Sequence, residues 1–372
     1  MLAIGMMSGT SLDGIDVALV EISDKKEASI RVSLLDFVTH PYQEKTVARI
    51  RDAMSLKHSN VLLICQLHVE LGKLYGKAAK QMMEKHNLSG ADIAYIANHG
   101  QTIYHDPTSE FPSTLQIGES AEITEITGVK TLSNFREADI AAGGQGAPIV
   151  PFTEYQLYHS SEKDRILVNI GGIANLTILA RDGNMSSIIA FDTGPGNMMI
   201  DAAMQKFYQK KYDDGGKIAA SGKVNQPLLN ELMDHPYLSQ QYPKTTGREM
   251  FGEEMTEALF QAYHLLPEDW VATFTAFTAK SLCQAFATFS KQQLEVIVAG
   301  GGAYNKTLMD WIRLESQCDV LTQEALGYSS EAKEAIAMAV LGKYTLEHTA
   351  NNVPSATGAR HAVILGKITD VR

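Results

Sequence analysis

The feature of this sequence that most restricts its fold is a succession of strands around a glycine-rich loop, which occurs twice, about half a chain apart. In each copy an apolar strand leads into a loop of small and polar residues, and two further strands follow. Strands joined by short links pair as an antiparallel meander. The strands are expected at residues 2–7, 15–22 and 30–38 in the first copy, and at residues 165–170, 176–179 and 187–191 in the second. Because the copies share little identity, the repeat lies in the pattern, and it predicts two similar α/β lobes.

The rest of the chain is mainly helical, with two single strands. Apolar residues at helical spacing predict helices at residues 43–54, 61–85, 253–264, 270–289, 305–315 and 331–347. The single strands are expected at residues 93–97 and 294–299, the first followed by a turn at 98–101.

Length and the loop-rich stretch 134–151 suggest where the two lobes divide. A domain usually takes about 100–200 residues, so 372 residues favour two domains. We expect one domain from residues 1–131 together with the C-terminal tail from about residue 350 to 372, and a second from residues 132–349.

Composition limits the classes of partner. The net charge of -11 disfavours nucleic acid and anionic membranes, and no apolar run approaches the ~18 residues of a membrane span. The three cysteines are far apart and form no CxxC pair, which argues against a disulfide framework and fits a reducing cytoplasm. No basic residue precedes Lys25, so the charged start of a signal peptide is also missing.

The first loop, residues 8–14 (SGTSLDG), offers hydroxyl and backbone donors, and its glycines let an anion approach the backbone closely. Phosphate oxygens are the natural ligand, and the Asp13 carboxylate could hold Mg²⁺ directly or through water. The alternative is an ordinary hairpin turn, in which serine, glycine and aspartate are common.

The second loop, residues 169–175 (NIGGIAN), occupies the same place in the second copy. Two matched loops are harder to explain as turns than one. We infer a nucleotide held in a cleft between the copies. The string FDTGPGN follows at residues 191–197, and Asp192 at the end of a strand is well placed for a general base. Its alternative role is that of a helix N-cap.

Three further groups of residues are candidates for ligand contact. The glycines of GGGAYN, residues 300–305, let a flat group such as adenine lie on the backbone. His99 and Gln101 offer polar groups to sugar hydroxyls, although a lone histidine is more often structural. Arg136 can bind a carboxylate through two hydrogen bonds or form a surface ion pair, and Glu334 by itself fits a solvated helix position.

Motifs of several other enzyme classes are missing. The sequence has no GxxxxGK[ST], no GxGxxG, no HExxH and no GxSxG. A P-loop NTPase, a dinucleotide-binding domain, a zincin and a serine hydrolase with a nucleophile elbow are therefore excluded.

Seven strings resemble, in order along the chain, those of the anhydro-N-acetylmuramic acid kinase family. They are GMMSGTSLDGID at residues 5–16, NHGQT at 98–102, FREADIAAGGQGAP at 135–148, NIGGIANLT at 169–177, FDTGPGN at 191–197, TTGREMFG at 245–252 and GGGAYN at 300–305. Such long strings in series are far more specific than any one glycine loop. The resemblance implies two actin/hexokinase-like (ribonuclease H-like) lobes with a duplicated βββ-αβα pattern and a nucleotide cleft between them.

The resemblance also implies an activity and roles for the residues. The family converts 1,6-anhydro-N-acetylmuramic acid, ATP and water to N-acetylmuramic acid 6-phosphate and ADP in bacterial peptidoglycan recycling. Asp192 would be the general base, and Asp13 would hold Mg²⁺. His99, Gln101, Arg136 and Glu334 would bind the sugar. The nucleotide would contact Gly9, Thr10, Ser11, Leu12, Asp13, Gly14, Ile15, Asp16, Asn169, Gly171, Gly172, Asn175, Gly194, Gly196, Asn197, Gly301, Gly302 and Asn305.

Members of the family suggest a cytoplasmic homodimer. Three other functions stay open: a kinase for another hexose or amino sugar, a non-catalytic sugar- or ATP-sensing module, and a glycoside hydrolase that opens the anhydro ring without ATP. The two phosphate loops disfavour the hydrolase.

Overall fold

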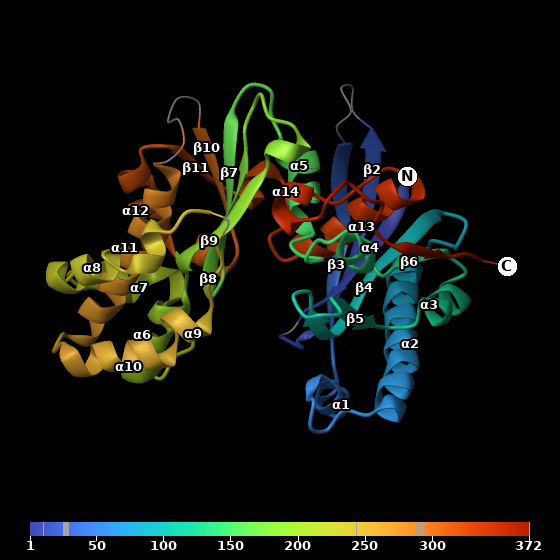
Figure 1. The fold of residues 1–372 in the computed structure, drawn as a ribbon, viewed down its shortest axis with the longest axis horizontal. Coiled ribbons are helices and arrows are strands. Elements are labelled where there is room, and N and C mark those ends of the chain that lie inside the picture. The colour runs from blue at the N-terminus through green and yellow to red at the C-terminus, as the bar shows by residue number, and fades with distance from the viewer. Residues whose placement is uncertain (10, 25–29, 243, 288, 290–293, 372) are drawn as a thin grey trace. The chain divides into compact units, whose positions relative to one another are not determined.

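The computed structural model describes residues 1–9, 11–24, 30–242, 244–287, 289 and 294–371 (Figure 1). The chain divides into two compact units. Unit 1 comprises Met1–Leu157 and Glu331–Arg372, and unit 2 comprises Tyr158–Ser330. This division differs from the expected domains, because residues 132–157 and 331–349 belong to unit 1.

Unit 1 contains a seven-stranded sheet and its helices. The strands are β1 (Leu2–Ser8), β2 (Gly14–Asp24), β3 (Ile30–Pro41), β4 (Ile93–Asp106), β5 (Ser113–Ile117), β6 (Thr131–Ser133) and β12 (Lys367–Thr369). The helices are α1 (Glu44–Met54), α2 (Val61–Lys85), α3 (Ser120–Thr127), α4 (Glu137–Ala141), α5 (Val150–Tyr158), α13 (Lys333–Leu346) and α14 (Pro354–Thr357).

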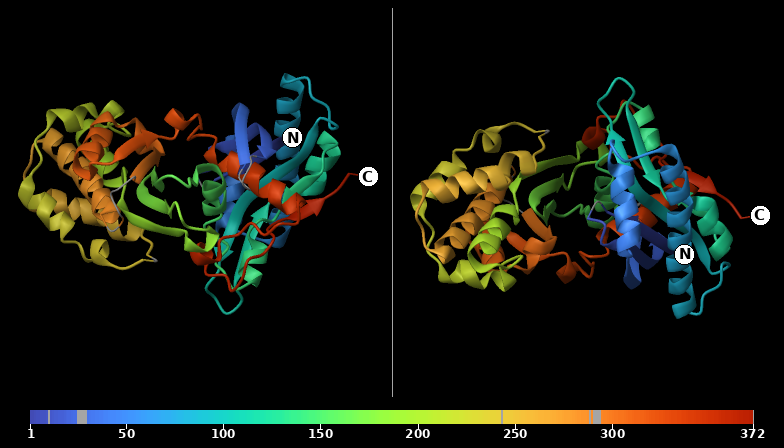
Figure 2. Two further views of the ribbon diagram at one scale, coloured as in Figure 1. Left: turned by 90° about the horizontal axis from the view of Figure 1, so that it is seen from above. Right: turned by 90° about the horizontal axis from the view of Figure 1, so that it is seen from below.

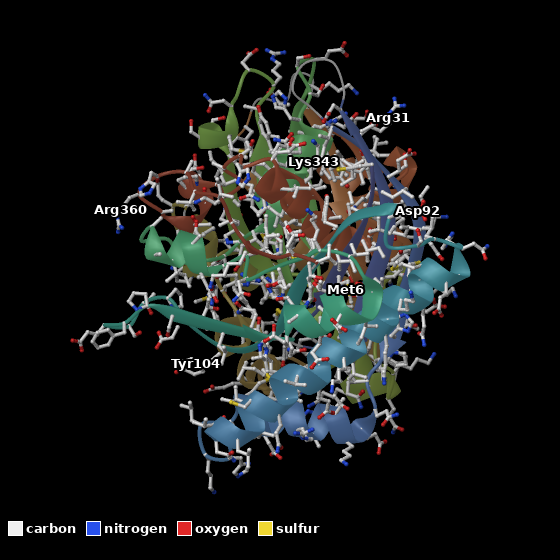
Figure 3. All side chains as sticks on the ribbon, turned by 90° about the vertical axis from the view of Figure 1, so that its right-hand side faces the viewer. Met6, Arg31, Asp92, Tyr104, Lys343 and Arg360 are labelled. Carbon is white, nitrogen blue, oxygen red and sulfur yellow. The ribbon has the colours of Figure 1, made fainter. Side chains whose placement is uncertain are left out.

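The first sheet has the order β12-β6-β4-β1-β2-β3, with β5 paired to β4. Strands β1, β2 and β3 form the expected antiparallel meander, and β4 lies parallel to β1. One face of this sheet is covered by α2, whose Leu67 and Leu71 share a buried core with Ile4 and Met6 of β1. Figure 3 shows Met6 inside unit 1, while Arg31 and Arg360 lie at its periphery.

Helix α13 packs on the other face of the same sheet, which explains why it belongs to unit 1. A Cβ on Gly5 of β1 would collide with the Ala335 carbonyl of the helix. The hydroxyl of Tyr95 in β4 donates 2.6 Å to the Ala339 carbonyl. Figure 2 shows the helix, in red, beside the blue strands. Its apolar residues run all round the helix, so periodicity predicts that it is buried but not in which lobe.

Residues 132–157 join unit 1 through β6 and a buried carboxylate. The strand β6 pairs with β4, and Leu132 is opposite Ala97. Asp139 is buried and accepts hydrogen bonds from Asn352 Nδ2 and Thr357 Oγ1, both at 2.7 Å. The stretch 134–151 is therefore fastened within unit 1 and does not mark the division of the chain.

Unit 2 contains a five-stranded sheet and a larger set of helices. The strands are β7 (Asp164–Ile170), β8 (Ile173–Leu179), β9 (Ile189–Pro195), β10 (Leu294–Ala299) and β11 (Asp319–Thr322). The helices are α6 (Met198–Tyr208), α7 (Lys217–Ser221), α8 (Gln226–Met233), α9 (Arg248–Phe251), α10 (Glu253–Ala262), α11 (Pro267–Phe286) and α12 (Lys306–Ser316).

The second sheet repeats the topology of the first. Its order is β11-β10-β7-β8-β9, with β7, β8 and β9 antiparallel and β10 and β11 parallel to β7. In unit 1 the corresponding order is β6-β4-β1-β2-β3. This shared order confirms the predicted fold class of two actin/hexokinase-like α/β lobes. Helices α11 and α12 cover one face of the second sheet, where Ile166, Val168 and Ile170 meet Leu282 and Ile312.

One local prediction is wrong. Residues 98–101 form no turn, because β4 continues through them to Asp106. The strand changes register between Met6 and Ser8 of its partner β1, and Gly100 adopts a φ of 78° at that irregularity. Polar residues and a glycine therefore mark a bulge in a strand here. None of the helices in the described residues combines the length and apolar character that a bilayer span requires.

Candidate functional site

The first loop follows β1 and leads into β2. Thr10 lies outside the described residues. Leu12, at a φ of 61°, and Ile15 are buried in the core of unit 1, and a Cβ on Gly14 would collide with the His40 carbonyl. A Cβ on Gly9, by contrast, would meet only Ser11 Oγ at 3.7 Å. Ser11 and Asp13 are exposed. Among the described residues of the loop, Gly9, Ser11 and Asp13 form the surface open to a ligand, while Leu12 and Gly14 anchor the loop.

Gln101 forms hydrogen bonds to Ser8 and Gly9 at the start of this loop. Its side chain is 0% exposed, and its Oε1 accepts 2.7 Å from Ser8 Oγ. Its Nε2 donates to the carbonyls of Gly9 and Thr102 at 3.4 and 3.3 Å. Ser8 Oγ also lies 2.9 Å from the hydroxyl of Tyr42. The amide of Gln101 is thus committed within the protein, and it fixes the start of the first loop.

His99 and Arg136 form a second polar pair in unit 1. His99 is 3% exposed, and its Nε2 accepts 2.9 Å from Arg136 Nε. Burial, followed by the charge of Arg136, lowers the pKa of His99 to about 3. The ring is therefore neutral, and its Nδ1 donates to the Gly100 carbonyl at 2.8 Å. Arg136 Nη1 donates 2.7 Å to the Gly146 carbonyl.

Arg136 does not form the surface ion pair that its sequence context allowed. It is half-buried, burial lowers its pKa, and the described residues place no carboxylate within ion-pair distance of it. An arginine carries five N–H donors and stays charged in proteins. Two are used by His99 and Gly146, so the guanidinium keeps donors for an anionic ligand.

Two carboxylates accompany Arg136. The pKa of Glu334 is raised, chiefly by burial of its charge and also by Asp16, while Lys333 and Arg136 oppose the shift. Although many protein atoms surround its carboxyl group, Glu334 is exposed by surface area, so it is open to a ligand. Burial also raises the pKa of Asp16, although a 2.6 Å hydrogen bond from Thr39 Oγ1 acts in the opposite direction. Asp16 and Arg136 therefore each lie within electrostatic reach of Glu334 in unit 1.

The second loop is a two-residue hairpin, Gly171-Gly172, between β7 and β8. Its carbonyls accept from the start of α6: Gly196 N donates 2.8 Å to the Gly172 oxygen, and Asn197 N donates 2.7 Å to the Gly171 oxygen. The hairpin is thus fastened to the helix. Asn175, expected in the loop, lies inside β8.

The glycines of unit 2 fall into two groups. Cβ atoms on Gly171, Gly172 and Gly301 would meet nothing closer than 3.5 Å, which is ordinary van der Waals contact, and Gly172 and Gly301 are exposed. A Cβ on Gly196 would collide with the Gly171 carbonyl, and one on Gly302 with the Ile170 side chain. Gly194 has a φ of 144°, which L side chains rarely adopt. The first group can face a ligand, whereas the second is required for packing.

Two asparagines hold these turns in place. Asn197 Nδ2 donates 3.2 Å to the Ile170 carbonyl, next to Gly301 and Gly302. Asn305 is buried, and its Oδ1 accepts 3.0 Å from Leu308 N as the N-cap of α12. Asn305 therefore terminates the glycine turn and starts the helix.

Asp192 was expected at the end of a strand, but it lies inside β9, in a row of polar side chains across three strands. Asn169 of β7 is opposite Asn175 of β8, which is opposite Asp192 of β9. Directly opposed residues have Cβ atoms about 4.5–5.5 Å apart on one face of a sheet. Their neighbours Val168 and Leu176 face the core under α11, so the polar row occupies the opposite face.

Asp192 is not the N-cap of α6, because that position belongs to Asn197. Instead the half-buried carboxylate bonds to the strap, which we define as residues 237–242 and 244–246. Its Oδ2 accepts 2.7 Å from Thr245 Oγ1 and 3.0 Å from Thr246 N. Thr245 and Thr246 belong to the string TTGREMFG at residues 245–252, which supports the family resemblance but does not by itself suggest a role for them.

The carboxylates of the first loop suit Mg²⁺. The charges of Asp13 and Asp16 act on one another, and oxygen is the ligand type that Mg²⁺ prefers. The described residues contain no group of three or more metal-binding side chains. That donor set fits an ion held by one or two carboxylates together with phosphate and water, as in many phosphoryl-transfer enzymes.

Solved structures with a similar arrangement are distant. They include the "(R)-2-hydroxyglutaryl-CoA dehydratase component A" of Acidaminococcus fermentans, at a TM-score of 0.42 and 11% identity, with 91% of this chain and 96% of that chain covered. The "ROK hexokinase" of Thermus thermophilus gives a TM-score of 0.38 at 13% identity, with 92% and 99% covered. Scores this low do not identify a fold, and the assignment rests on the strand order.

Comparison by sequence is more decisive. The family described as anhydro-N-acetylmuramic acid kinase matches residues 1–371. The chain is 48% identical over 372 residues to the "Anhydro-N-acetylmuramic acid kinase" of Francisella tularensis subsp. novicida (strain U112), with 98% of this chain and 97% of that protein covered. It is 46% identical over 377 residues to the protein of the same name from Clostridioides difficile (strain 630), with 99% and 98% covered. The chain therefore belongs to the anhydro-N-acetylmuramic acid kinase family.

Proposed function

We propose that this chain is an ATP-dependent kinase that opens 1,6-anhydro-N-acetylmuramic acid with water and phosphorylates O6, giving N-acetylmuramic acid 6-phosphate and ADP. Its place would be the recycling of peptidoglycan. The observation that carries this proposal is the half-buried Asp192, aligned with Asn169 and Asn175 at the hairpin whose Gly171 and Gly172 are open to a ligand.

Asp192 acts as the general base. A water molecule gives a proton to its carboxylate, and the water oxygen attacks the anomeric carbon. The bond between that carbon and O6 breaks, and its electron pair stays on O6. O6 then attacks the γ-phosphorus and ADP leaves. Asp192 releases its proton to the solvent, so the atoms of sugar, water and ATP are all accounted for. A positioned base contributes about 10²–10⁴-fold to such a step.

Residues of unit 1 recognise the sugar. Arg136 keeps donors for the lactyl carboxylate, and the neutral ring of His99 fixes its orientation. Glu334 accepts hydrogen bonds from the polar substituents of the sugar. Because Gln101 is wholly bonded to Ser8, Gly9 and Thr102, we assign it to the support of the first loop.

The nucleotide is bound by backbone and hydroxyl donors of both glycine loops. Gly9, Ser11 and the hairpin Gly171-Gly172 take phosphate oxygens, and Gly301 allows adenosine to approach the backbone. Asp13, with Asp16 nearby, would hold Mg²⁺. The bound ion neutralises developing phosphate charge.

The assembly and location follow from the family and the substrates. We propose a homodimer, and a cytoplasmic location because the reaction consumes ATP. The net charge of -11 gives no support for nucleic acid or anionic membranes as partners.

A product assay tests this function against its alternatives. The protein is incubated with 1,6-anhydro-N-acetylmuramic acid, glucose or N-acetylglucosamine, each with and without ATP, and the products are identified by mass spectrometry. We expect a phosphosugar from the anhydro sugar only, and only with ATP. Phosphorylation of glucose or N-acetylglucosamine at a comparable rate would instead identify a general hexose kinase. Ring opening without ATP would identify a hydrolase. The absence of any product would favour a sensing module.

A further inference from the structure

The strap is attached to β9 around Asp192 on several sides. Asp192 N donates 3.1 Å to the Lys244 carbonyl, and the Asp192 carbonyl accepts 2.8 Å from the hydroxyl of Tyr237. The carboxylate then receives Thr245 Oγ1 and Thr246 N on the same oxygen, Oδ2. Two main-chain and two side-chain contacts thus fix one residue.

The strap is held by packing as well as by polar bonds: Tyr237 is buried in the core of unit 2, and Tyr242 stacks on Phe191. Lys244 Nζ donates to the carbonyls of Tyr237 and Leu238, both at 3.1 Å, and lies over the Tyr237 ring. Beneath the strap is a cavity of about 410 Å³, lined among others by Phe191, Leu238 and Ser281. Thr245 is not among the residues that line this cavity, and its hydroxyl is held beside the Asp192 carboxylate by the hydrogen bond to Oδ2.

The two carboxylate oxygens of Asp192 are therefore unequal. Oδ2 carries two hydrogen bonds, which stabilise negative charge on that oxygen and make it a poorer proton acceptor. The described residues give Oδ1 no hydrogen-bond donor, so this oxygen is the one left for a water molecule. The titratable strap groups beside Asp192 are Tyr237, whose pKa is raised by burial and then by the charge of Asp192, and Lys244, whose pKa burial lowers.

We propose that Thr245 is a positioning residue, which clamps Oδ2 of Asp192 and so presents Oδ1 to the attacking water. This inference rests on the proposed role of Asp192 as the base. Thr245 does not touch the reacting atoms, and it acts through the orientation and charge of the carboxylate. The conservative serine retains the hydroxyl, whereas valine keeps the shape of threonine without it.

The test compares Thr245→Val, Thr245→Ser and Thr245→Ala with the parent enzyme. For Thr245→Val and Thr245→Ala we expect kcat to fall about tenfold, the equivalent of one hydrogen bond to a charged group, with KM for both substrates unchanged. Thr245→Ser, which keeps the hydroxyl, should restore kcat. Ser239→Ala is the matched control on the strap, since within the described residues that hydroxyl donates to the Pro236 carbonyl at 3.0 Å and does not contact Asp192.

The possible outcomes distinguish a failure of the Thr245 clamp from a failure of the proposed role of Asp192 as the general base. A parental kcat in Thr245→Val overturns the clamp, provided that Asp192→Asn in the same assay is inactive. An active Asp192→Asn variant overturns the role of Asp192 itself. A loss of kcat that Thr245→Ser does not restore also contradicts the clamp. Thermal melting shows whether Thr245→Val fails to fold. In that case the kcat of Thr245→Ala decides the test, because alanine is smaller than threonine and the position is exposed.

Discussion

His99 accepts a 2.9 Å hydrogen bond from Arg136, so a buried neutral imidazole orients a half-buried guanidinium. The pair is asymmetric. Arginine stays charged at any pH at which the protein folds, and the pKa of His99 is lowered to about 3 by burial and by that charge. Protonation of His99 would remove the acceptor that fixes Arg136.

Stability should therefore fall on the acid side because of His99. The histidine titrates near 6.5 in the unfolded chain and near 3 in the folded protein. Above pH 6.5 both states are neutral and the contribution is complete. It is lost as the pH falls through that window, by up to about 1.4 kcal/mol per pH unit. Urea unfolding of the parent and of His99→Gln at pH 7, 6 and 5 should show a shallower loss in the variant. Equal slopes would contradict a neutral buried His99.

Arg136→Lys should weaken sugar binding selectively. Lysine keeps the charge but cannot donate to both His99 and Gly146 while it binds a carboxylate. We expect kcat/KM for the anhydro sugar to fall roughly 10–100-fold, with KM for ATP near that of the parent. Steady-state kinetics with each substrate varied in turn measure this. An equal rise in the two KM values would argue against a role in sugar recognition.

The two groups of glycines should respond differently to alanine. Gly172→Ala should fold normally, because its Cβ would make only ordinary van der Waals contact, 3.8 Å from Met198 Cε. It should raise KM for ATP, because a methyl group on this exposed residue would stand in the way of the phosphates. Gly196→Ala should lower the free energy of unfolding by about 1–3 kcal/mol, because its Cβ would collide with the Gly171 carbonyl. Denaturant unfolding and ATP kinetics on both variants distinguish the groups. A Gly172→Ala enzyme with parental KM for ATP would remove the hairpin from the nucleotide site.

Gln101→Met should affect the nucleotide more than the sugar. Methionine fills a similar volume but cannot bond to Ser8 and Gly9, so the first loop loses its support. We expect KM for ATP to rise about tenfold, the equivalent of one hydrogen bond, with KM for the sugar little changed. A rise confined to the sugar would restore the direct sugar contact that the sequence suggested.

Asp192→Asn should retain ATP binding and lose turnover. The amide keeps the size of the carboxylate but is a far weaker proton acceptor, so we expect kcat to fall about 10²–10⁴-fold. Binding of ATP followed by calorimetry should match that of the parent. Turnover near the parental rate would exclude Asp192 as the base.

The sequence predicts local structure well where periodicity is strong. The meander strands, α2 and β10 lie where apolar spacing placed them. The lobe to which α13 belongs could not be predicted, because the close approach of Gly5 to the helix backbone depends on tertiary packing. The two roles of the glycines are also invisible in a string of identical letters. They become separable only when the atoms that a Cβ would meet are known.

The candidate site shows the same limit. Glycine loops and Asp192 can be recognised from residue type and order. The commitment of Gln101 to Ser8 and the clamp of Thr245 on Asp192 join residues far apart in the chain, and neither has a local signal. Polar residues at 98–101 suggested a turn because bulges and turns use the same residue types.

The central claim is that Asp192 directs water to the anomeric carbon while O6 receives the phosphoryl group. The most direct test is the reaction with 1,6-anhydro-N-acetylmuramic acid and ATP in ¹⁸O-water, stopped early and followed by mass spectrometry of the sugar phosphate and its fragments. One ¹⁸O atom at the anomeric carbon and none in the transferred phosphoryl group is the predicted result. Label in the phosphoryl group, or an anomeric oxygen without label before exchange, would contradict it.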